Sequence, residues 1–178
     1  MDHATRVLDA AETLFYDRGI QAVGMDAIRA ESGVALKRLY TLFPSKDHLV
    51  AEYLRRRDTR WREALATHVA TAPGTPVLAV FDWLHTWFST PTFRGCAFIN
   101  SFAELGPTSP AVTAITRAHK EALRTYLHNL LTDRPDLTDQ VLLLIEGAIV
   151  TASITSSPAP AHHARAAVEA LLSTRCPF

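Results

Sequence analysis

The stretch that decides the fold is Ser32-Gly33-Val34-Ala35-Leu36-Lys37-Arg38-Leu39-Tyr40-Thr41-Leu42-Phe43-Pro44-Ser45-Lys46. Its pattern predicts a glycine turn, a very short helix over 36–42, and a further helix that Ser45 caps at its start. Two turns of helix bury too little surface to be stable alone, so neighbouring elements must hold this one. Its outward face carries Lys37, Arg38 and Tyr40. A short basic helix behind a tight turn has the form of a DNA-recognition helix.

The segments on both sides of this stretch also follow helical periodicity. Upstream, apolar residues recur at helical spacing until Gly19, and a second short helix is expected over 25–32. Downstream, a long fourth helix runs from Ser45 to about Pro73. Proline- and glycine-rich breaks then delimit five more helices, at about 77–89, 96–105, 111–132, 137–155 and 161–174. No segment alternates with a period of two, so we predict an all-α fold with three N-terminal helices and a six-helix body.

Composition indicates a globular chain without a metal or redox framework. Of its 178 residues, 48% are hydrophobic and 20% are charged. No apolar run approaches the roughly 20 residues of a membrane-spanning helix, and the N-terminus is no signal peptide. Cys96 and Cys176 lie too far apart in sequence to suggest a disulfide framework or a zinc pattern. We therefore expect a cytoplasmic protein without metal or cofactor that does not interact with membranes.

Charge is unevenly distributed along the chain. The net charge is zero, but residues 33–62 carry eight basic side chains against three acidic ones, a net charge of +5. The remainder of the chain is correspondingly acidic. Such a chain can bind phosphate through one surface only, which is compatible with nucleic-acid binding.

The eighth predicted helix is apolar on nearly all sides. Val141-Leu142-Leu143-Leu144-Ile145 and Ala148-Ile149-Val150 leave it little polar surface, so it must be covered on several faces. The ninth helix is rich in alanine, which allows close approach of a neighbour. These features favour a homodimer through the eighth and ninth helices, about 137–174. The alternative is that both helices form only the intrachain core.

The residues after the glycine turn extend into a longer signature. Gly33-Val34, Leu39-Tyr40, Phe43-Pro44-Ser45-Lys46-Asp47 and Leu49 together closely resemble the DNA-binding signature of the tetracycline-repressor (TetR) family. This resemblance implies a helix-turn-helix DNA-binding domain over 1–45 and an effector-binding and dimerisation domain over 46–178. It also implies a dimeric repressor that binds a pseudo-palindromic operator and is released by a small effector. Its partners are double-stranded DNA, the effector and a second copy of itself.

The resemblance also assigns roles to individual side chains. Tyr40 and Lys46 match family positions that contact the DNA backbone, and Lys37 and Arg38 match positions that face the major groove. Arginine and lysine donate well to guanine. Thr41 lies on the same side and is expected to contact phosphate or a thymine methyl group. The chain departs from the family pattern at three positions, where Gly24, Ala35 and Leu36 replace common polar residues. Specificity is therefore expected to rest mainly on Lys37 and Arg38.

The body contains candidate effector-binding residues, most of them apolar and a few polar. This set comprises Trp83, Trp87, Phe98, Asn100, Phe102 and Glu146. Asn100 and Glu146 stand among apolar residues and need partners. The aromatic content favours a hydrophobic, planar effector. The alternative is that the aromatic residues are core.

Cys96 follows Arg94-Gly95 at the start of the sixth helix. A thiol at a helix N-terminus beside an arginine is a candidate sensor of electrophiles or oxidants. Some proteins that resemble this family have a similar Gly-Cys pair and respond to reactive species. The alternative is a small buried apolar residue.

Two other classes of function remain as alternatives, a helical enzyme and an adaptor that does not bind DNA. The sequence contains no GxSxG, phosphate-binding glycine loop or HExxH motif, so no enzyme activity is expected. An adaptor would have no need for Lys37, Arg38, Tyr40 and Lys46 on one surface.

Overall fold

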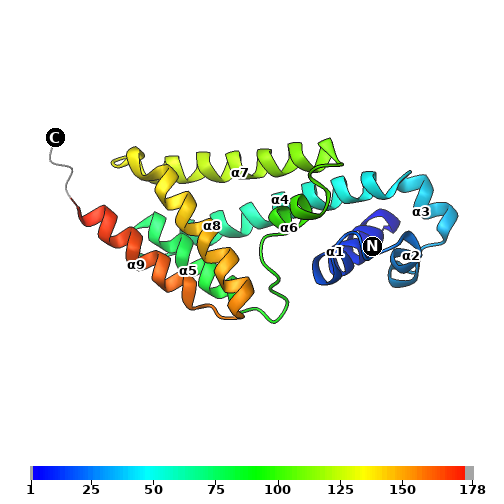
Figure 1. Ribbon diagram of the computed structural model, residues 1–178, viewed down its shortest axis with the longest axis horizontal. Helices are drawn as coiled ribbons and strands as arrows, with labels where there is room; N and C mark the ends of the chain where they lie inside the picture. Colours follow the sequence, from blue (N-terminus) through cyan, green and yellow to red (C-terminus); the bar gives the residue numbers. More distant parts are fainter. Residues whose placement is uncertain (1, 175–178) are drawn as a thin grey trace. The chain divides into compact units, whose positions relative to one another are not determined.

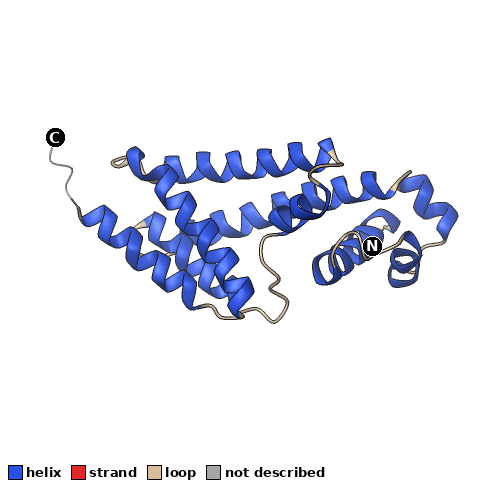
Figure 2. Cartoon of the chain, in the orientation of Figure 1, coloured by secondary structure: helices blue, strands red, loops and turns tan. Residues whose placement is uncertain are grey.

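The computed structural model describes residues 2–174, and all regular structure within that range is helical (Figure 2). In chain order the elements are α1 (His3–Arg18), α2 (Met25–Ser32), α3 (Leu36–Leu42), α4 (Lys46–Thr71), α5 (Pro76–Phe88), α6 (Ala97–Leu105), α7 (Pro110–Leu130), the short 3-10 turn η1 (Pro135–Leu137), α8 (Thr138–Thr155) and α9 (Ala159–Ser173) (Figure 1). The predicted all-α fold and helix order are confirmed. Cys176 lies outside the described residues.

Contacts divide the chain into two compact units. Unit 1 comprises Met1–Thr59 and Ala97–Ala118, and unit 2 comprises Arg60–Cys96 and His119–Phe178. The long helices α4 and α7 each contribute one part to each unit. The predicted functional division into 1–45 and 46–178 concerns activity and stays a prediction.

The core of unit 1 is built from the helical stripes that the sequence shows. Val7 of α1, Ile28 of α2 and Leu39 of α3 are fully buried. The rings of Phe15 and Tyr53 pack at a centroid distance of 5.7 Å and join α1 to α4. Because each short helix buries its apolar residues against the others, the three N-terminal helices are stabilised as a set.

Polar side chains cap two helices of unit 1. The Asp2 carboxylate accepts a hydrogen bond from the Thr5 backbone N–H at 2.9 Å, and this bond holds the pKa of Asp2 below its usual range. At the start of α4, the Ser45 hydroxyl accepts from the His48 N–H at 3.1 Å, as the sequence predicts. Each cap satisfies an N–H group that has no partner within its helix.

In unit 2, α9 packs against both α5 and α8 (Figure 1). The buried side of α8 consists of Val141, Ile145, Ala148, Ile149 and Ala152. Its opposite side is apolar but exposed, since Leu143 is 71% and Ile154 is 77% solvent-accessible.

One segment of unit 2 is more apolar than the sequence analysis expected. Pro135–Thr155 is a 21-residue helical segment with a mean hydropathy of 1.5, long and apolar enough by length and composition to cross a membrane. The uninterrupted apolar runs are short because Asp139 and Glu146 divide them, but the average over the segment is high. The buried residues of α8 make this helix part of the core of unit 2.

Candidate nucleic-acid interface

The turn between α2 and α3 depends on a glycine. Gly33 has φ 62° and ψ 20°, the left-handed conformation that side chains with a Cβ atom disfavour. Its N–H closes α2 by bonding to the Arg29 carbonyl at 3.0 Å. Val34 follows with 3% exposure and fixes the turn in the core. The result is a helix-turn-helix of α2, three turn residues and α3.

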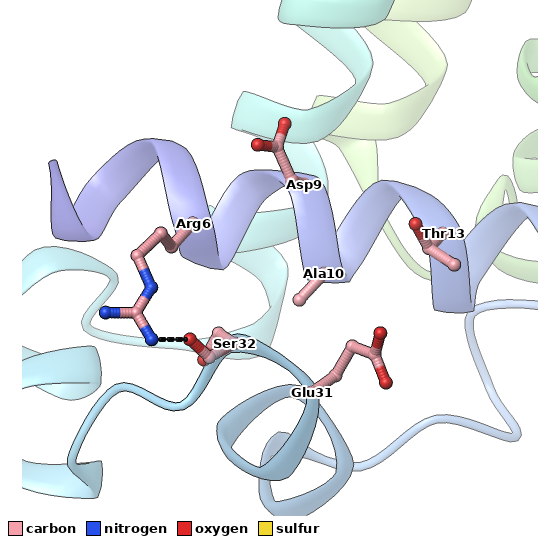
Figure 3. A pocket seen from close by; sticks show the side chains of 6 residues that line it. All are labelled: Arg6, Asp9, Ala10, Thr13, Glu31 and Ser32. Atoms are coloured by element: carbon pink, nitrogen blue, oxygen red, sulfur yellow. Dashed lines mark hydrogen bonds between the residues drawn. The ribbon is translucent and has the colours of Figure 1, made fainter. Parts of the chain in front are cut away.

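Arg6 of α1 holds this turn from the side. Its guanidinium Nη2 donates to the Ser32 carbonyl at 2.6 Å (Figure 3). A Cβ atom at Gly33 would lie 2.7 Å from the same nitrogen, so a side chain there would displace the end of Arg6 from its position. Arg6 and Ser32 form one end of a shallow cavity of about 290 Å³ between α1 and α2. Sequence reasoning did not find this role of Arg6, because its partner lies 26 residues away.

The outer face of α3 presents the predicted recognition residues together. Leu39 has no exposed surface, whereas Lys37, Arg38 and Thr41 are exposed and Tyr40 is 44% accessible. Lys37 and Arg38 take part in no ion pair within the described part of the chain. The Thr41 hydroxyl donates to the Lys37 carbonyl at 2.8 Å, so its proton is already engaged. Leu36 joins this face at 39% exposure, an apolar member that the sequence analysis had counted only as a lost polar residue.

Lys46 is the first residue of α4 and is half-buried. It follows the Ser45 cap directly, so the capped start of α4 fixes its backbone. The structure thus brings Lys37, Arg38, Tyr40, Thr41 and Lys46 into one compact unit, with the first four on one short helix.

The arginine run that follows is used differently. Arg55 pairs with Glu52 at 2.6 Å, and Arg56 pairs with Asp9 at 2.9 Å and with Glu12 at 2.8 Å. Arg57 bonds to Glu12 at 3.0 Å and lies over the Tyr16 ring at 3.8 Å. Asp9, Glu12 and Tyr16 all lie on α1, so no local pattern in the sequence indicates these contacts. Much of the positive charge of residues 33–62 is therefore neutralised, and the recognition face retains Lys37 and Arg38.

Aromatic side chains gather inside unit 2. The Trp61 ring lies 5.0 Å from Trp83 and 5.7 Å from Trp87, both edge to face, and 5.3 Å from His119. Trp83 and Trp87 stack on each other at 5.5 Å. Trp83 and Trp87 are predicted to bind the effector, and part of each side chain is exposed. Nearby in sequence, on α4, the buried Nε2 atom of His68 has no hydrogen-bond partner, a feature without any sequence signal.

The other predicted effector-binding residues are divided between the two units. Phe98, Asn100 and Phe102 lie on α6 in unit 1, where Phe98 is buried, Asn100 is exposed and Phe102 is 46% exposed. Glu146 lies on α8 in unit 2 and is paired with Lys120. The expectation that Glu146 needs a polar partner is confirmed. The effector-binding role of all six residues stays a prediction.

Cys96 is free, 6% exposed, and lies next to a charged pair. Lys120 Nζ is 3.5 Å from the Cys96 sulfur and 2.7 Å from both carboxylate oxygens of Glu146. The thiol is thus a buried group, as the alternative interpretation held, and a lysine of α7 lies beside it.

Taken together, a glycine-turned helix pair, a basic exposed α3 and a separate helical unit define a helix-turn-helix DNA-binding protein of the kind that regulates transcription. Residues 7–53 match the family model described as bacterial regulatory proteins, tetR family. The solved structure of SCO4454, a TetR-family transcriptional regulator from Streptomyces coelicolor, is 30% identical, with a TM-score of 0.87 over 96% of this chain and 94% of that chain.

Two relatives extend the comparison. The uncharacterized HTH-type transcriptional regulator Rv1255c of Mycobacterium tuberculosis is 27% identical, with 88% of each chain covered. The HTH-type transcriptional repressor KstR of Mycolicibacterium smegmatis is 39% identical over 71 residues, which cover 40% of this chain and 34% of that one. This chain belongs to the TetR family of transcriptional regulators, and it is not an enzyme.

Proposed function

We propose that this regulator is a ligand-responsive repressor, which binds a pseudo-palindromic operator as a dimer and is released by a small hydrophobic or aromatic effector. The observation that carries the proposal is the outer face of α3, where the cations Lys37 and Arg38 are exposed and form no ion pair within the described part of the chain. Unpaired exposed cations are available to phosphates and guanines. A protein that binds operators on a bacterial chromosome acts in the cytoplasm, so the proposal includes that location.

The exposed side chains divide into two roles. Lys37 and Arg38 read guanine O6 and N7 in the major groove, and arginine is the better bidentate donor. Tyr40 and Lys46 fix the register by contacting phosphates. Because the Thr41 hydroxyl donates to its own helix, it meets DNA as an acceptor or through its methyl group. The nearby Leu36 can contact a thymine methyl group.

An exposed apolar stripe on α8 supports dimerisation. Leu143, Val150 and Ile154 are 71%, 40% and 77% exposed, and with Gly147 they recur at helical spacing along one side of α8. Beside this stripe a groove of about 320 Å³ is lined by residues of α8 and α9, including Pro160 and Ala164. Covering this surface with a second copy removes large apolar side chains from water. In a dimer on B-DNA the two α3 helices would lie about 34–36 Å apart.

The effector is proposed to bind in the body, among the aromatic side chains. Trp83 and Trp87 of unit 2 offer partly exposed aromatic surface, and Glu146 lies in the same unit. The effector binds the released form of the protein more tightly than the DNA-bound form, so DNA and effector weaken each other's binding by the same factor.

The most informative experiment is selection of duplexes from a random pool by the purified full-length protein. We expect a recovered site with two related half-sites separated by about one helical turn. Binding to it should fall steeply with added salt, because phosphate contacts release counterions. A protein that retains no duplex at low salt contradicts the proposal.

One observation favours a second function, the sensing of electrophiles through Cys96. The ammonium of Lys120 lies 3.5 Å from the Cys96 sulfur, and the nucleophilic form of a cysteine is the thiolate. The thiolate would add to the β-carbon of an unsaturated carbonyl compound, forming a C–S bond, and a proton from solvent would complete the α-carbon.

This second function is tested in a Cys176→Ser background, which leaves Cys96 as the only thiol. Reaction with N-ethylmaleimide should add one adduct by intact mass and weaken operator binding. Addition of Cys96→Ser should abolish both effects. An unmodified protein after prolonged exposure would exclude Cys96 as a sensor.

A further inference from the structure

The C-terminal end of α6 is bonded to the loop between α1 and α2. The two carboxylate oxygens of Glu104 accept from consecutive backbone N–H groups, that of Ile20 at 3.0 Å and that of Gln21 at 2.8 Å. The Gln21 side-chain amide donates in return to the Glu104 carbonyl at 2.6 Å. These three bonds join segments 83 and 84 residues apart in the chain, and all of them lie within unit 1.

The loop is shaped to receive this carboxylate. Gly19 ends α1 with φ 84°, and a Cβ atom there would lie 3.2–3.4 Å from the carboxylate atoms of Glu104. Glycine therefore leaves room for the carboxylate and turns the two following N–H groups towards it. Two successive N–H groups aimed at one anion are a recognised backbone device for binding negative charge.

Stabilisation of α1 does not explain the contact. A carboxylate at the C-terminal end of a helix faces the negative end of the helix dipole, which disfavours it. The two charge-assisted hydrogen bonds must offset that cost. What they fix is the position of the loop relative to α6.

The loop in turn leads directly into the DNA-binding helices. Ile20 and Val23 are each 2% exposed, so the loop is also anchored in the core of unit 1. Gly24, the next residue, is the N-cap of α2, and α2 packs against α1 and α3. A change at the loop is therefore passed to α2 and α3 through packed helices rather than absorbed by a flexible segment.

We propose that Glu104 is a positioning residue for DNA recognition, which fixes the orientation of the helix-turn-helix relative to α6. It contacts no base or phosphate itself and acts through the α1–α2 loop. Any event that displaces α6 thus lowers operator affinity by breaking these bonds. The inference rests on the proposed function to the extent that it requires an operator.

The test compares Glu104→Gln with Glu121→Gln in the full chain, on the operator recovered from the random pool. Both changes remove one negative charge, and Glu121 is an exposed residue of α7 whose recorded contact is a 3.9 Å pair with Arg124. Charge removal alone leaves DNA affinity unchanged or raises it, because DNA is an anion. Loss of positioning acts in the opposite direction. We expect Glu104→Gln to weaken operator binding about tenfold, the order of one charged hydrogen bond, and Glu121→Gln not to weaken it.

Three further measurements separate positioning from simple destabilisation or direct contact. The amide NMR signals of Ile20 and Gln21 should move in Glu104→Gln, while signals from the buried residues of α1 and α3 keep their positions. The dependence of affinity on salt should be unchanged, since no phosphate contact is lost. Gln21→Ala, which keeps both N–H groups and removes only the return bond, should weaken binding less than Glu104→Gln does.

Each outcome decides the matter. If Glu104→Gln binds the operator as Glu121→Gln does, or more tightly, the positioning role is wrong. If Glu104→Gln fails to fold, Gln21→Ala decides, and unchanged operator affinity in that variant overturns the proposal. If the unaltered protein binds no duplex at all, the proposed function itself fails, a result distinct from either of these.

Discussion

At the scale of single residues, neighbours on α3 have opposite roles. Leu39 is fully buried, while Arg38 before it and Tyr40 after it are exposed. In a helix of two turns each position is committed to one side, so a single residue carries a large share of either packing or recognition.

Arg38→Ala should relax sequence preference rather than abolish binding. Loss of one bidentate contact to guanine costs about 1–3 kcal/mol at the base pair concerned and little elsewhere in the site. Competition binding against operators with single base-pair changes measures this directly. If the ranking of those operators is the same for Arg38→Ala and the unaltered protein, Arg38 does not read a base.

Lys46→Ala should instead weaken binding to all duplexes by a similar factor. A lysine that neutralises one phosphate contributes about one unit to the slope of log affinity against log salt concentration, and the variant should lose that unit. Lys46→Arg is the matched control, because it keeps the charge. An unchanged salt slope in Lys46→Ala would show that this half-buried lysine does not reach DNA.

Residues that act on nearby positions of the chain are easier to predict from sequence than residues that act on distant ones. Gly33 and Ser45 act within a few positions of the chain, so the local pattern predicted the turn and the cap. Glu104 and Arg56 act on partners 83 and 44 residues away, and no local pattern indicates such a pair. The arginine run shows the consequence, because Arg56 and Arg57 pair with acidic residues of α1 that are distant in sequence.

At the scale of elements, residues at the helix ends determine where each helix of unit 1 begins and ends. Boundaries were well predicted because Gly, Pro, Ser and Asp mark them through backbone geometry and capping. Which helices pack together could not be predicted as well from the sequence. The sequence did not indicate that α6 would group with α1–α3, since that grouping depends on contacts between distant residues.

Ser45→Ala should lower the free energy of unfolding by about 1 kcal/mol, within the range of about 0.5–2 kcal/mol for loss of an N-cap. The variant removes the acceptor for the His48 N–H, which is 3.1 Å away. Urea denaturation followed by circular dichroism measures the change. Ser45→Asp keeps an acceptor at this position and should stay close to the unaltered protein. Equal stability of Ser45→Ala would mean that water replaces the cap at no cost.

The cap of α1 should make the stability of the protein depend on acidity. The Thr5 N–H lowers the pKa of Asp2 in the folded state, so the carboxylate contributes stability above the unfolded pKa. That contribution is lost as pH falls through the lower folded pKa. Asp2→Asn caps without titrating in this range.

Urea unfolding of both proteins between about pH 5 and about pH 2 tests this linkage. We expect the stability of the unaltered protein to fall relative to Asp2→Asn as the solution is acidified. A constant difference between the two proteins over the whole range would show that Asp2 does not cap α1 in solution.

At the scale of the whole molecule, the proposed function depends on two surfaces of each chain. In that proposal α3 of each subunit reads one half-site, and one half-site gives few base contacts. The exposed stripe on α8 would join two such subunits. The apolar character of α8 predicted this arrangement from sequence, because a helix apolar on both sides needs two covers. Which residues are buried within the chain and which stay exposed required the structure.

Leu143→Glu combined with Ile154→Glu should convert the dimer into a folded monomer. Both side chains are more than two-thirds exposed, at 71% and 77%, so the new carboxylates are solvated in a monomer but face each other's apolar surface in a dimer. Light scattering after gel filtration measures the mass, and circular dichroism checks the fold. Ala64→Glu, at an exposed position of α4, controls for added negative charge.

The monomer should bind a full operator no better than a single half-site, because its α3 helix is no longer joined to that of a second subunit. A double variant that stays dimeric would show that the exposed stripe of α8 does not form the dimer interface.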